Sequence, residues 1–535
     1  MSTIWNAEPG RLERWVVKNS TWLALGIIAV AFAIRIAYAN ACYLNPDEAL
    51  HFDSARPATW VEAFKASLRL AHPPLFILVL HGFLALGRSE LILRLPSLLA
   101  GTAALWLTFT WIRRSLGDIP ALAGLSFMAL SPVAVSASTE VRQYGLFLFF
   151  VCGALYATER IFAERSRTWV VIQGLFLLCA LLTHYIAVLV LVSLGVYVLL
   201  RLILEGVSGR MLLTFCVSQL VIATTLIGLY FGHVRKSIPF GSGASMDYLR
   251  HYYYNAAGES WMGFMWRMLS RTFSYMSGSH LLALVFMLLS LAGLAAVMTG
   301  KTHAPKLLAL LILSPFVVGF TAAAFQVFPF AGTRHQTYLL PFLAASIAAG
   351  FASLPRQWTV PLLLVGVVIS PFWIKRAPPD NDPRVMPRRD MTAALEYIHR
   401  FVPKGSPLFV DSDTREIFEY YMGKDDRALD TLRPEADVEE ELGGYRAIVA
   451  VVSITPSIIE DPRLATTDFA LRPNESIEQV IRSAIGLGVP PGAPVWAASV
   501  SWKEPPLASQ LAPASDREIK GFGEISVVRL LAQAQ

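Results

Sequence analysis

Two adjacent carboxylates, Asp47 and Glu48, follow the first long apolar run of the chain, residues 22–39. They belong to the octapeptide Asn45-Pro46-Asp47-Glu48-Ala49-Leu50-His51-Phe52. A carboxylate at a membrane surface can deprotonate or orient a hydroxyl group, and ionisable groups beside hydrocarbon are rare without a function. A second explanation makes Asn45-Pro46 a turn and places Asp47 near the N-cap of a solvated helix. The spacing alone is compatible with both explanations.

Further polar residues that could act with this pair lie beside later apolar runs. They are His51, His72, Arg94, Glu140, Arg142, Tyr144, His184, Arg334 and His335. Guanidinium groups match phosphate in bidentate geometry, histidine can hydrogen-bond a phosphate or a sugar, and tyrosine can stack on a sugar ring. With Asp47 as a base, this set suits the transfer of a sugar from a phosphate leaving group to a hydroxyl.

Each of these residues also has a purely structural explanation. Arg94 could extend from a helix end towards the headgroups, and Glu140 and Arg142 could form an ion pair at the interface. His184 could cap a turn between two helices, and Arg334 could anchor the start of a helix. A set of Asp, Glu and His side chains could also bind a divalent cation, but no spacing in the sequence predicts a metal site.

The composition indicates a polytopic α-helical membrane protein. The 535 residues are 55% hydrophobic and 16% charged, against about 25% charged residues in soluble domains. The mean hydropathy is +0.51. The apolar residues gather in twelve segments, most of them long enough to span a bilayer. These segments are 20–40, 74–88, 95–112, 120–137, 143–162, 168–184, 186–204, 211–232, 281–299, 306–325, 336–353 and 358–374.

The distribution of Lys and Arg predicts the orientation. A basic flank before the first segment predicts a cytoplasmic N-terminus, and no cleavable signal peptide is expected. If all twelve segments spanned, the basic loops at 113–114, 165–167 and 301–306 would face outside, against the usual cytoplasmic excess of positive charge. If 74–88 is only a partial or re-entrant span, every later basic loop lies on the cytoplasmic side, as the rule requires. We therefore expect about eleven spans, with the candidate site residues on the non-cytoplasmic face.

The domain organisation follows from this orientation. Residues 1–375 form the membrane domain, with a first outer loop at 41–73. A second outer loop at 233–280 is rich in basic and aromatic residues, which suits a phosphate-bearing lipid headgroup, although an interfacial loop without a ligand explains it as well. Residues 376–535 read as a soluble α/β accessory domain on the outer surface. Its expected helices are 391–401 and 414–422, and its expected strands are 407–411, 447–453, 495–502 and 525–531.

Cysteine content and charge exclude several classes of function. Three of the four cysteines, Cys152, Cys179 and Cys216, fall inside apolar segments, and Cys42 has no obvious partner. We expect no disulfide and no cysteine metal site. The net charge of +6 reflects basic inner loops, so nucleic-acid binding is not predicted.

An ordered series of motifs resembles a known family. The series is Asn45-Pro46-Asp47-Glu48-Ala49-Leu50-His51-Phe52, His72-Pro73-Pro74-Leu75, Leu93-Arg94-Leu95-Pro96-Ser97, Ser131-Pro132 and Glu140-Val141-Arg142-Gln143-Tyr144. It resembles the lipid-phosphate-sugar-dependent glycosyltransferases of the GT-C fold. Within them it is most similar to bacterial relatives of dolichyl-phosphate-mannose protein mannosyltransferase (glycosyltransferase family 39), which include the aminoarabinose transferases. The resemblance covers about residues 20–375 and leaves the tail unmatched.

The resemblance implies inverting transfer of a sugar from a polyprenyl-phosphate donor to an acceptor hydroxyl of an envelope lipid, glycan or protein. It implies a location in the plasma (inner) membrane, with the site on the periplasmic face. By position, Asp47 matches the family's catalytic acidic residue, and Glu48 and His51 match the rest of the same motif. His72 stands where the aminoarabinose transferases have a phosphate-contacting lysine. Arg94 matches the arginine of the Arg-Leu-Pro segment.

Two other classes of function stay open at this point. A transporter or flippase of lipid-linked sugars would share the polar cavity but would need no base, so Asp47→Asn would change transport only mildly. The sequence shows no convincing internal repeat of the kind common in transporters. A non-catalytic subunit of an envelope assembly would keep partner binding after changes at Asp47 and Arg142.

Overall fold

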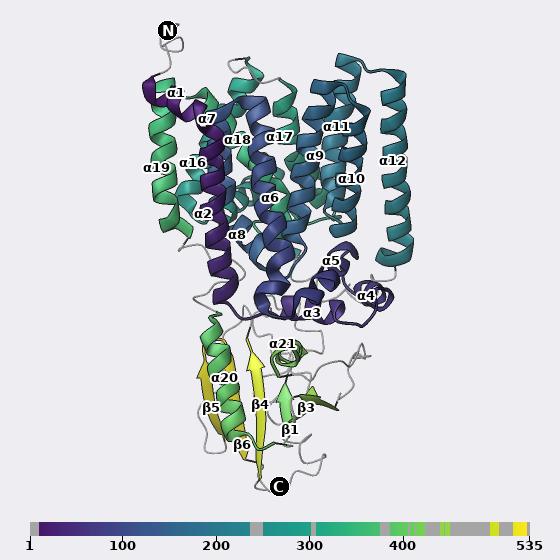
Figure 1. Ribbon diagram of the computed structural model, residues 1–535, viewed down its shortest axis with the longest axis vertical. Coiled ribbons are helices and arrows are strands. Elements are labelled where there is room, and N and C mark those ends of the chain that lie inside the picture. Colours follow the sequence, from purple (N-terminus) through teal and green to yellow (C-terminus); the bar gives the residue numbers. More distant parts are fainter. Residues whose placement is uncertain are drawn as a thin grey trace. The chain divides into compact units, whose positions relative to one another are not determined.

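The computed structural model describes residues 10–235, 250–300, 306–374, 386–404, 407–410, 412–422, 439–442, 445–449, 493–501 and 517–531 (Figure 1). The chain forms two compact units. The membrane unit comprises Met1–Ala37, Phe64–Gly87 and Leu91–Asp380, and the second unit comprises Tyr38–Ala63, Arg88–Glu90 and Asn381–Gln535. Residues 41–63 of the expected first outer loop therefore group with the C-terminal tail, although they are far from the tail in sequence.

The membrane unit is helical. Its helices begin with α1 (Arg11–Lys18), α2 (Ser20–Ala41), α5 (Leu75–Phe83), α6 (Glu90–Leu116), α7 (Asp118–Leu130), α8 (Pro132–Thr139), α9 (Tyr144–Glu164), α10 (Arg167–Thr183), α11 (Ala187–Glu205) and α12 (Gly209–Leu229). They continue with α15 (Trp261–Ser277), α16 (His280–Met298), α17 (Leu307–Ala324), α18 (Leu340–Ser353) and α19 (Arg356–Ile374). All twelve apolar segments of the sequence are helical. The helix α4 (Trp60–Ser67) crosses the boundary between the two units.

Several of these helices can cross a bilayer, which makes the chain a multi-pass membrane protein. Within the described residues, seven helices are long and apolar enough, or eight if α7 and α8 form one bent span, against the eleven or so spans expected from the sequence. The helix α5 and the 3₁₀ turn after it cover only Leu75–Leu86. At 1.5 Å per residue this segment is about 18 Å long, well short of a hydrocarbon core of about 30 Å. This length fits the partial span predicted for 74–88.

Small residues let α16 and α18 pack closely. A Cβ atom added to Gly293 of α16 would collide with the backbone of Gly350 in α18, and one added to Gly350 would collide with Leu289. The hydroxyls of Ser290 and Ser346 bond to each other across the same interface at 2.8 Å. Close backbone approach and side-chain hydrogen bonds are the usual means of helix association in membranes.

The second unit is built on a mixed six-stranded sheet in the order β2-β3-β1-β4-β6-β5. The strands are β1 (Pro407–Val410), β2 (Glu439–Leu442), β3 (Tyr445–Val449), β4 (Pro494–Val500), β5 (Arg517–Phe522) and β6 (Ile525–Leu531). The β1 strand pairs parallel with β3 and β4, and the other pairs are antiparallel. The helices α20 (Arg388–Phe401) and α21 (Ser412–Met422) pack against the sheet (Figure 1).

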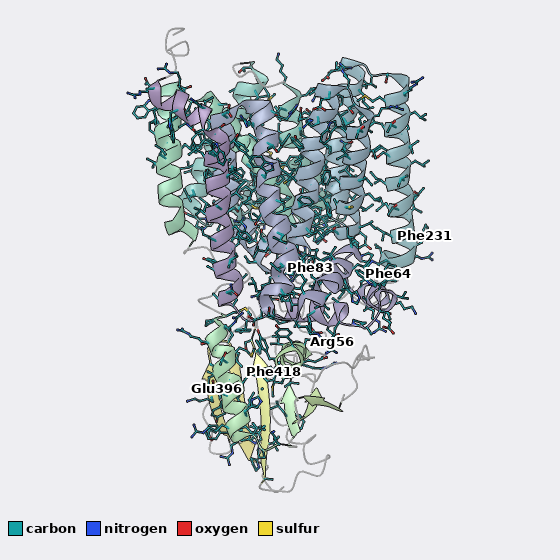
Figure 2. All side chains as sticks on the ribbon, in the orientation of Figure 1. Arg56, Phe64, Phe83, Phe231, Glu396 and Phe418 are labelled. Carbon is teal, nitrogen blue, oxygen red and sulfur yellow. The ribbon has the colours of Figure 1, made fainter. Side chains whose placement is uncertain are left out.

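Residues of the first outer loop belong to the core of this α/β unit. Tyr43, and Ala49 of α3 (Pro46–Ala55), are buried in the same apolar cluster as Phe418 of α21, which Figure 2 labels. The backbone N–H of Tyr43 donates to the Met386 carbonyl at 3.3 Å. Burial raises the pKa of the Tyr43 hydroxyl, and the charges of Glu524 and Asp390 raise it further. The loop after α2 is therefore a structural part of the α/β unit.

The tail shows where sequence patterns predict well. Both expected helices are present, and the strands expected at 407–411, 495–502 and 525–531 are present with shifted ends. The described part of the strand expected at 447–453 lies in β3, and residues 450–453 fall outside the described residues. The strands β2 and β5 were not predicted, since both are rich in charged residues. In the membrane unit, α15 was not predicted either, because it lies inside the expected loop 233–280.

Candidate functional site

The eleven predicted site residues fall in both compact units. Asp47, Glu48 and His51 lie on α3 in the second unit. The other eight lie in the membrane unit, and they are His72, Arg94, Glu140, Arg142, Tyr144, His184, Arg334 and His335.

One carboxylate of the Asp47–Glu48 pair, that of Glu48, caps the start of α3. Asn45 is the N-cap, and Pro46 occupies the first turn, where its missing N–H costs nothing. The Asn45 side chain accepts from the Glu48 N–H at 3.0 Å, and Glu48 Oε2 accepts from the Asn45 N–H at 3.0 Å. This reciprocal capping box satisfies two backbone donors of the helix start. Glu48 is fully buried, and one of its carboxylate oxygens serves this turn.

Asp47 takes no part in the capping box, and its side chain is half-buried. The Asp47 carbonyl lies 2.5 Å from Nδ1 of His51, one turn along the helix. A carbonyl oxygen only accepts, so Nδ1 of His51 carries a proton and the neutral ring keeps Nε2 as an acceptor. The backbone of Asp47 therefore fixes the tautomer of His51, while the Asp47 carboxylate lies outside the capping box.

A second group of polar side chains gathers around His184 in the membrane unit, in the turn between α10 and α11. The His184 ring lies 4.9 Å from the ring of His72 and 5.4 Å from the ring of Tyr144, measured between centroids. The Arg142 guanidinium lies 5.4 Å from the centroid of the Tyr144 ring. The structure thus brings together four residues that the sequence proposed separately. The name His184 cluster is used below for His72, Arg142, Tyr144 and His184.

Hydrogen bonds in this cluster leave polar atoms unused. Nδ1 of His184 accepts from the Ile186 N–H at 3.1 Å, so neutral His184 carries its proton on Nε2. Among the described residues, neither Nε2 of His184 nor the Tyr144 hydroxyl has a hydrogen-bond partner, although both atoms are buried. A buried polar group without a partner costs about 1–3 kcal/mol. Two such groups in one cluster are typical of a site that binds a polar ligand.

Positive charge surrounds His184. Burial lowers the pKa of His184 well below its ordinary value, and the charges of His335, Arg142 and Arg334 lower it further. His184 is therefore neutral at pH 7 and acts as an N–H donor rather than as a cation. The electrostatic effect also shows that Arg334 and His335 act on the same cluster. A site with two arginines and a neutral N–H donor suits an anionic ligand with several acceptor oxygens.

Two further predicted residues, Arg94 and Glu140, are fully buried. Arg94 lies on α6, one turn before Ser97, whose hydroxyl donates to the Arg142 carbonyl at 2.7 Å. The Glu140 carboxylate accepts from the Ser136 hydroxyl one turn earlier. Hydrogen bonds thus hold the turn 140–143, which joins α8 to α9, to both α6 and α8.

Sequence reasoning missed Gln143 and His233. Gln143 is fully buried, and neither atom of its amide group has a partner among the described residues. Gln143 lies in the quoted motif between Arg142 and Tyr144. Its position was therefore known from the sequence, but the sequence did not predict that its side chain would be buried. A buried amide offers both a donor and an acceptor, which suits recognition of a hydroxyl group.

His233 forms hydrogen bonds with two segments that carry residues of the cluster. Its Nε2 donates to the Leu70 carbonyl at 2.8 Å, and the Tyr185 hydroxyl donates to its Nδ1 at 2.5 Å. Leu70 precedes His72 by two residues, and Tyr185 follows His184 directly. His233 lies in a π-helical turn after α12, Tyr230–Val234, a form that is frequent at functional sites. The only signal in the sequence was a histidine one residue past an apolar segment.

The segment 233–280, which was expected to be an outer loop, is less basic than its composition suggested. Arg267 forms an ion pair with Glu259 inside the same segment, which cancels part of the positive charge. Lys236 and Tyr248 lie outside the described residues. The prediction of a headgroup-binding loop stays a prediction.

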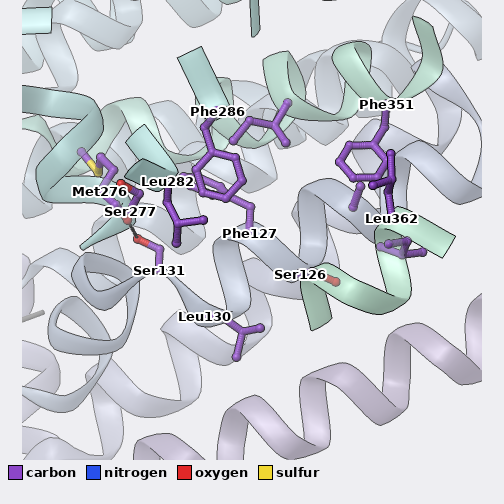
Figure 3. Close-up of a pocket in the computed structure, with 14 residues that line it drawn as sticks. Ser126, Phe127, Leu130, Ser131, Met276, Ser277, Leu282, Phe286, Phe351 and Leu362 are labelled. Carbon is purple, nitrogen blue, oxygen red and sulfur yellow. Dashed lines mark hydrogen bonds between the residues drawn. The ribbon is translucent and has the colours of Figure 1, made fainter. Parts of the chain in front are cut away.

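Two pockets among the described residues are lined by none of the predicted site residues. An apolar pocket in the membrane unit is lined by α7, α15, α16, α18 and α19 (Figure 3). A cleft of about 530 Å³ in the second unit is lined by Arg56, Arg88, Arg388 and the aromatic residues Phe52 and Tyr420. No group of three His, Cys, Asp or Glu among the described residues is placed to bind a metal ion. None of the four cysteines forms a disulfide.

Comparisons with known proteins identify the fold. Residues 71–230, which include all four residues of the His184 cluster, match the family model of dolichyl-phosphate-mannose-protein mannosyltransferases. Among curated proteins, no sequence matches the chain significantly. The crystal structure of ArnT from Cupriavidus metallidurans bound to undecaprenyl phosphate matches with a TM-score of 0.54 and 15% identity over 96% of this chain and 99% of that chain. The apo state of the same ArnT matches with a TM-score of 0.50 and 13% identity over 97% and 100%.

A further match is to the S. cerevisiae protein O-mannosyltransferase Pmt1-Pmt2 complex bound to the sugar donor. It has 16% identity and a TM-score of 0.31 over 42% of this chain and 35% of that chain, which is too low to compare folds. The ArnT matches show that the chain has the GT-C fold, as the ordered motifs predicted.

Proposed function

We propose that this GT-C membrane protein transfers a sugar from a polyprenyl-phosphate-linked donor to an acceptor hydroxyl on the non-cytoplasmic face of the plasma membrane. The observation that carries the proposal is the His184 cluster. It offers a buried N–H donor and a buried hydroxyl without partners among the described residues, next to an arginine and within the electrostatic reach of a second one. These groups suit a phosphate ester that carries a sugar, and all of them except Arg334 lie inside the family-matched segment.

The chemistry assigns a role to each group. The acceptor oxygen attacks the anomeric carbon of the sugar, and the bond from that carbon to the phosphate oxygen breaks with inversion. The electron pair leaves with the polyprenyl phosphate, which gains negative charge. Arg142 and Arg334 stabilise this charge as it develops, and His184 donates its Nε2 proton in a hydrogen bond without losing it.

Asp47 is the proposed base that receives the proton of the acceptor hydroxyl. It is the member of the carboxylate pair that the capping box leaves out. Glu48 holds the helix start and so supports Asp47 without reacting. The crystal structure of the relative ArnT bound to undecaprenyl phosphate supports a polyprenyl-phosphate donor for this chain, since the two chains share one fold along nearly their whole lengths.

A reconstituted transfer assay tests the proposal. The purified protein is placed in liposomes with a panel of polyprenyl-phosphate sugars and an envelope extract as acceptor, and mass spectrometry follows both. Wild-type protein is expected to consume one donor and to add the mass of one sugar to an acceptor. Asp47→Asn is expected to lower the rate by about 100-fold or more, the usual worth of a positioned base.

Asp53→Asn is the matched control. Asp53 lies on the same helix and forms an ion pair with Arg56 at 3.2 Å, and Arg56 keeps a closer ion pair with Glu419 at 2.6 Å, so loss of the Asp53 charge should leave the transfer rate unchanged. Wild-type turnover by Asp47→Asn would remove the proposed base. Movement of the donor across the bilayer without any covalent transfer would instead indicate a flippase and would overturn the proposed function.

A further inference from the structure

One arginine inside the membrane unit belongs to none of the groups described above. Arg35 lies on α2, six residues before the helix ends at Ala41, and it is fully buried. Its Nη1 donates to the Ala31 carbonyl at 3.1 Å and to the Ala129 carbonyl at 2.9 Å. Within the described parts of the chain, its Nε and Nη2 have no hydrogen-bond partner. A buried charge on an apolar helix is costly, so its presence requires a reason.

The partner of Arg35 marks a break between two helices. Ala129 stands in the last turn of α7, and α8 begins at Pro132 with a bend of 58°. The last carbonyls of a helix have no partner within it, and they carry the negative end of its dipole. Where a span breaks in this way, neighbouring helices, side chains, ordered water or local changes of the helix satisfy the freed carbonyls. Arg35 supplies both a hydrogen bond and a positive charge at this end of α7.

A second side chain ties the same break to another helix. The Ser131 hydroxyl, between α7 and α8, donates to the Met276 carbonyl of α15 at 2.6 Å, as Figure 3 shows. The break is thus held by α2 through Arg35 and by α15 through Ser131. The eight residues of α8 then lead directly into the turn that carries Arg142 and the start of α9 at Tyr144.

We infer that Arg35 is a positioning residue for the proposed sugar transfer, acting through the direction of α8. An apolar side chain at this position would pack without the cost of burying a charge. The hydrogen bond to Ala129 fixes how α8 leaves the break, and α8 in turn sets where the Arg142 guanidinium and the Tyr144 hydroxyl lie. This inference rests on the proposed function for its kinetic part only, because the ordering of α8 can be measured without any reaction.

The experiment compares three variants in detergent and in liposomes. Arg35→Met removes the donor and the charge, while Arg35→Lys keeps both on a shorter group. Ser126→Ala is the matched control, since it removes a buried hydroxyl that donates to the Leu122 carbonyl of the same helix α7, away from the break. Hydrogen–deuterium exchange reports on residues 132–144, and the transfer assay gives kcat and KM for the lipid-linked donor.

Arg35→Met is expected to speed exchange in residues 132–144 and to lower kcat/KM by about 100-fold, the effect of a displacement of about 1 Å in a reacting site. Arg35→Lys is expected to restore most of both properties, and Ser126→Ala to change neither. Unchanged exchange and unchanged kinetics per folded molecule in Arg35→Met would reduce Arg35 to a role in folding and overturn the inference. If wild-type protein transfers no sugar, the proposed function fails, and the exchange comparison still decides whether Arg35 orders α8.

Discussion

The start of α3 and the His184 cluster differ in the hydrogen bonding of their buried polar groups. At α3, Asn45 and Glu48 satisfy each other's backbone N–H groups, and the turn closes on itself. In the cluster, the Tyr144 hydroxyl and Nε2 of His184 are buried without partners among the described residues. The first arrangement stabilises the fold, and the second leaves binding capacity available to a ligand.

The contrast separates residues that look equivalent in the sequence. Glu48 and Asp47 are neighbouring carboxylates, but only Glu48 belongs to the capping box. A polar residue whose hydrogen bonds are complete should affect stability when it is changed. A polar residue with an unpaired polar atom should affect binding and rate instead. Removing that atom breaks no hydrogen bond of the unliganded protein, but it removes a possible bond to the ligand.

Tyr144→Phe is expected to have the largest of these effects. It removes a hydroxyl proposed to bind a charged donor, a hydrogen bond worth about 1.5–3 kcal/mol, so kcat/KM should fall by roughly 10- to 100-fold. Thermal stability without donor should stay the same or rise slightly. The control is Tyr197→Phe, whose buried hydroxyl donates to Glu159 at 2.8 Å and accepts from Arg201. It should lower the melting temperature and keep the rate, and the reverse pattern would contradict the comparison.

Changes at Glu48 should act on stability alone. Glu48→Ala removes one half of the capping box and should cost about 1 kcal/mol of unfolding free energy, the usual worth of a cap. Glu48→Gln keeps an acceptor that can close the box, so it should retain both stability and transfer. Denaturation and rate measurements on the two variants check this. Loss of transfer in a stable Glu48→Gln protein would make Glu48, rather than Asp47, the reacting carboxylate.

A smaller effect is expected in the dependence of stability on pH. The pKa of His184 is lowered in the folded protein, so below pH 6.5, its ordinary value, the unfolded chain takes up a proton that the folded chain does not. This term therefore favours unfolding as the pH falls below about 6.5 and vanishes above it. His184→Asn should lose less stability than wild type between pH 6.5 and pH 5, as thermal unfolding would show. Equal losses in both proteins would mean that His184 is protonated in the folded state.

Hydrophobic runs in the sequence predicted the membrane unit well. A membrane-spanning helix needs a long apolar segment, so each of the twelve segments could be read from composition, and each is helical. The helix α15 was not predicted because it is amphipathic and begins inside a polar stretch. Length also distinguished the short helix at 75–86 from its neighbours.

The candidate site was predictable in its members but not in its arrangement. The motifs supplied Arg142, Tyr144 and His184, yet nothing in the spacing showed that the His184 ring would lie between those of His72 and Tyr144. Contacts between distant segments also explain the residues that were missed. Arg35 and His233 matter through bonds to Ala129 and Leu70, which are backbone carbonyls of apolar residues and leave no mark in a sequence.

The second unit has a consequence for the order of events during synthesis. Its core includes Tyr43 and Ala49, yet the rest of that core begins at Met386, more than 300 residues later in the chain. A ribosome adds about 5–20 residues per second. The core residues after Met386 are therefore synthesised roughly 15 seconds to a minute after Tyr43 and Ala49. During that interval the nascent chain exposes apolar side chains that only the finished tail can cover. A truncated message would therefore leave an unfinished α/β unit attached to a membrane unit whose helices had already been made.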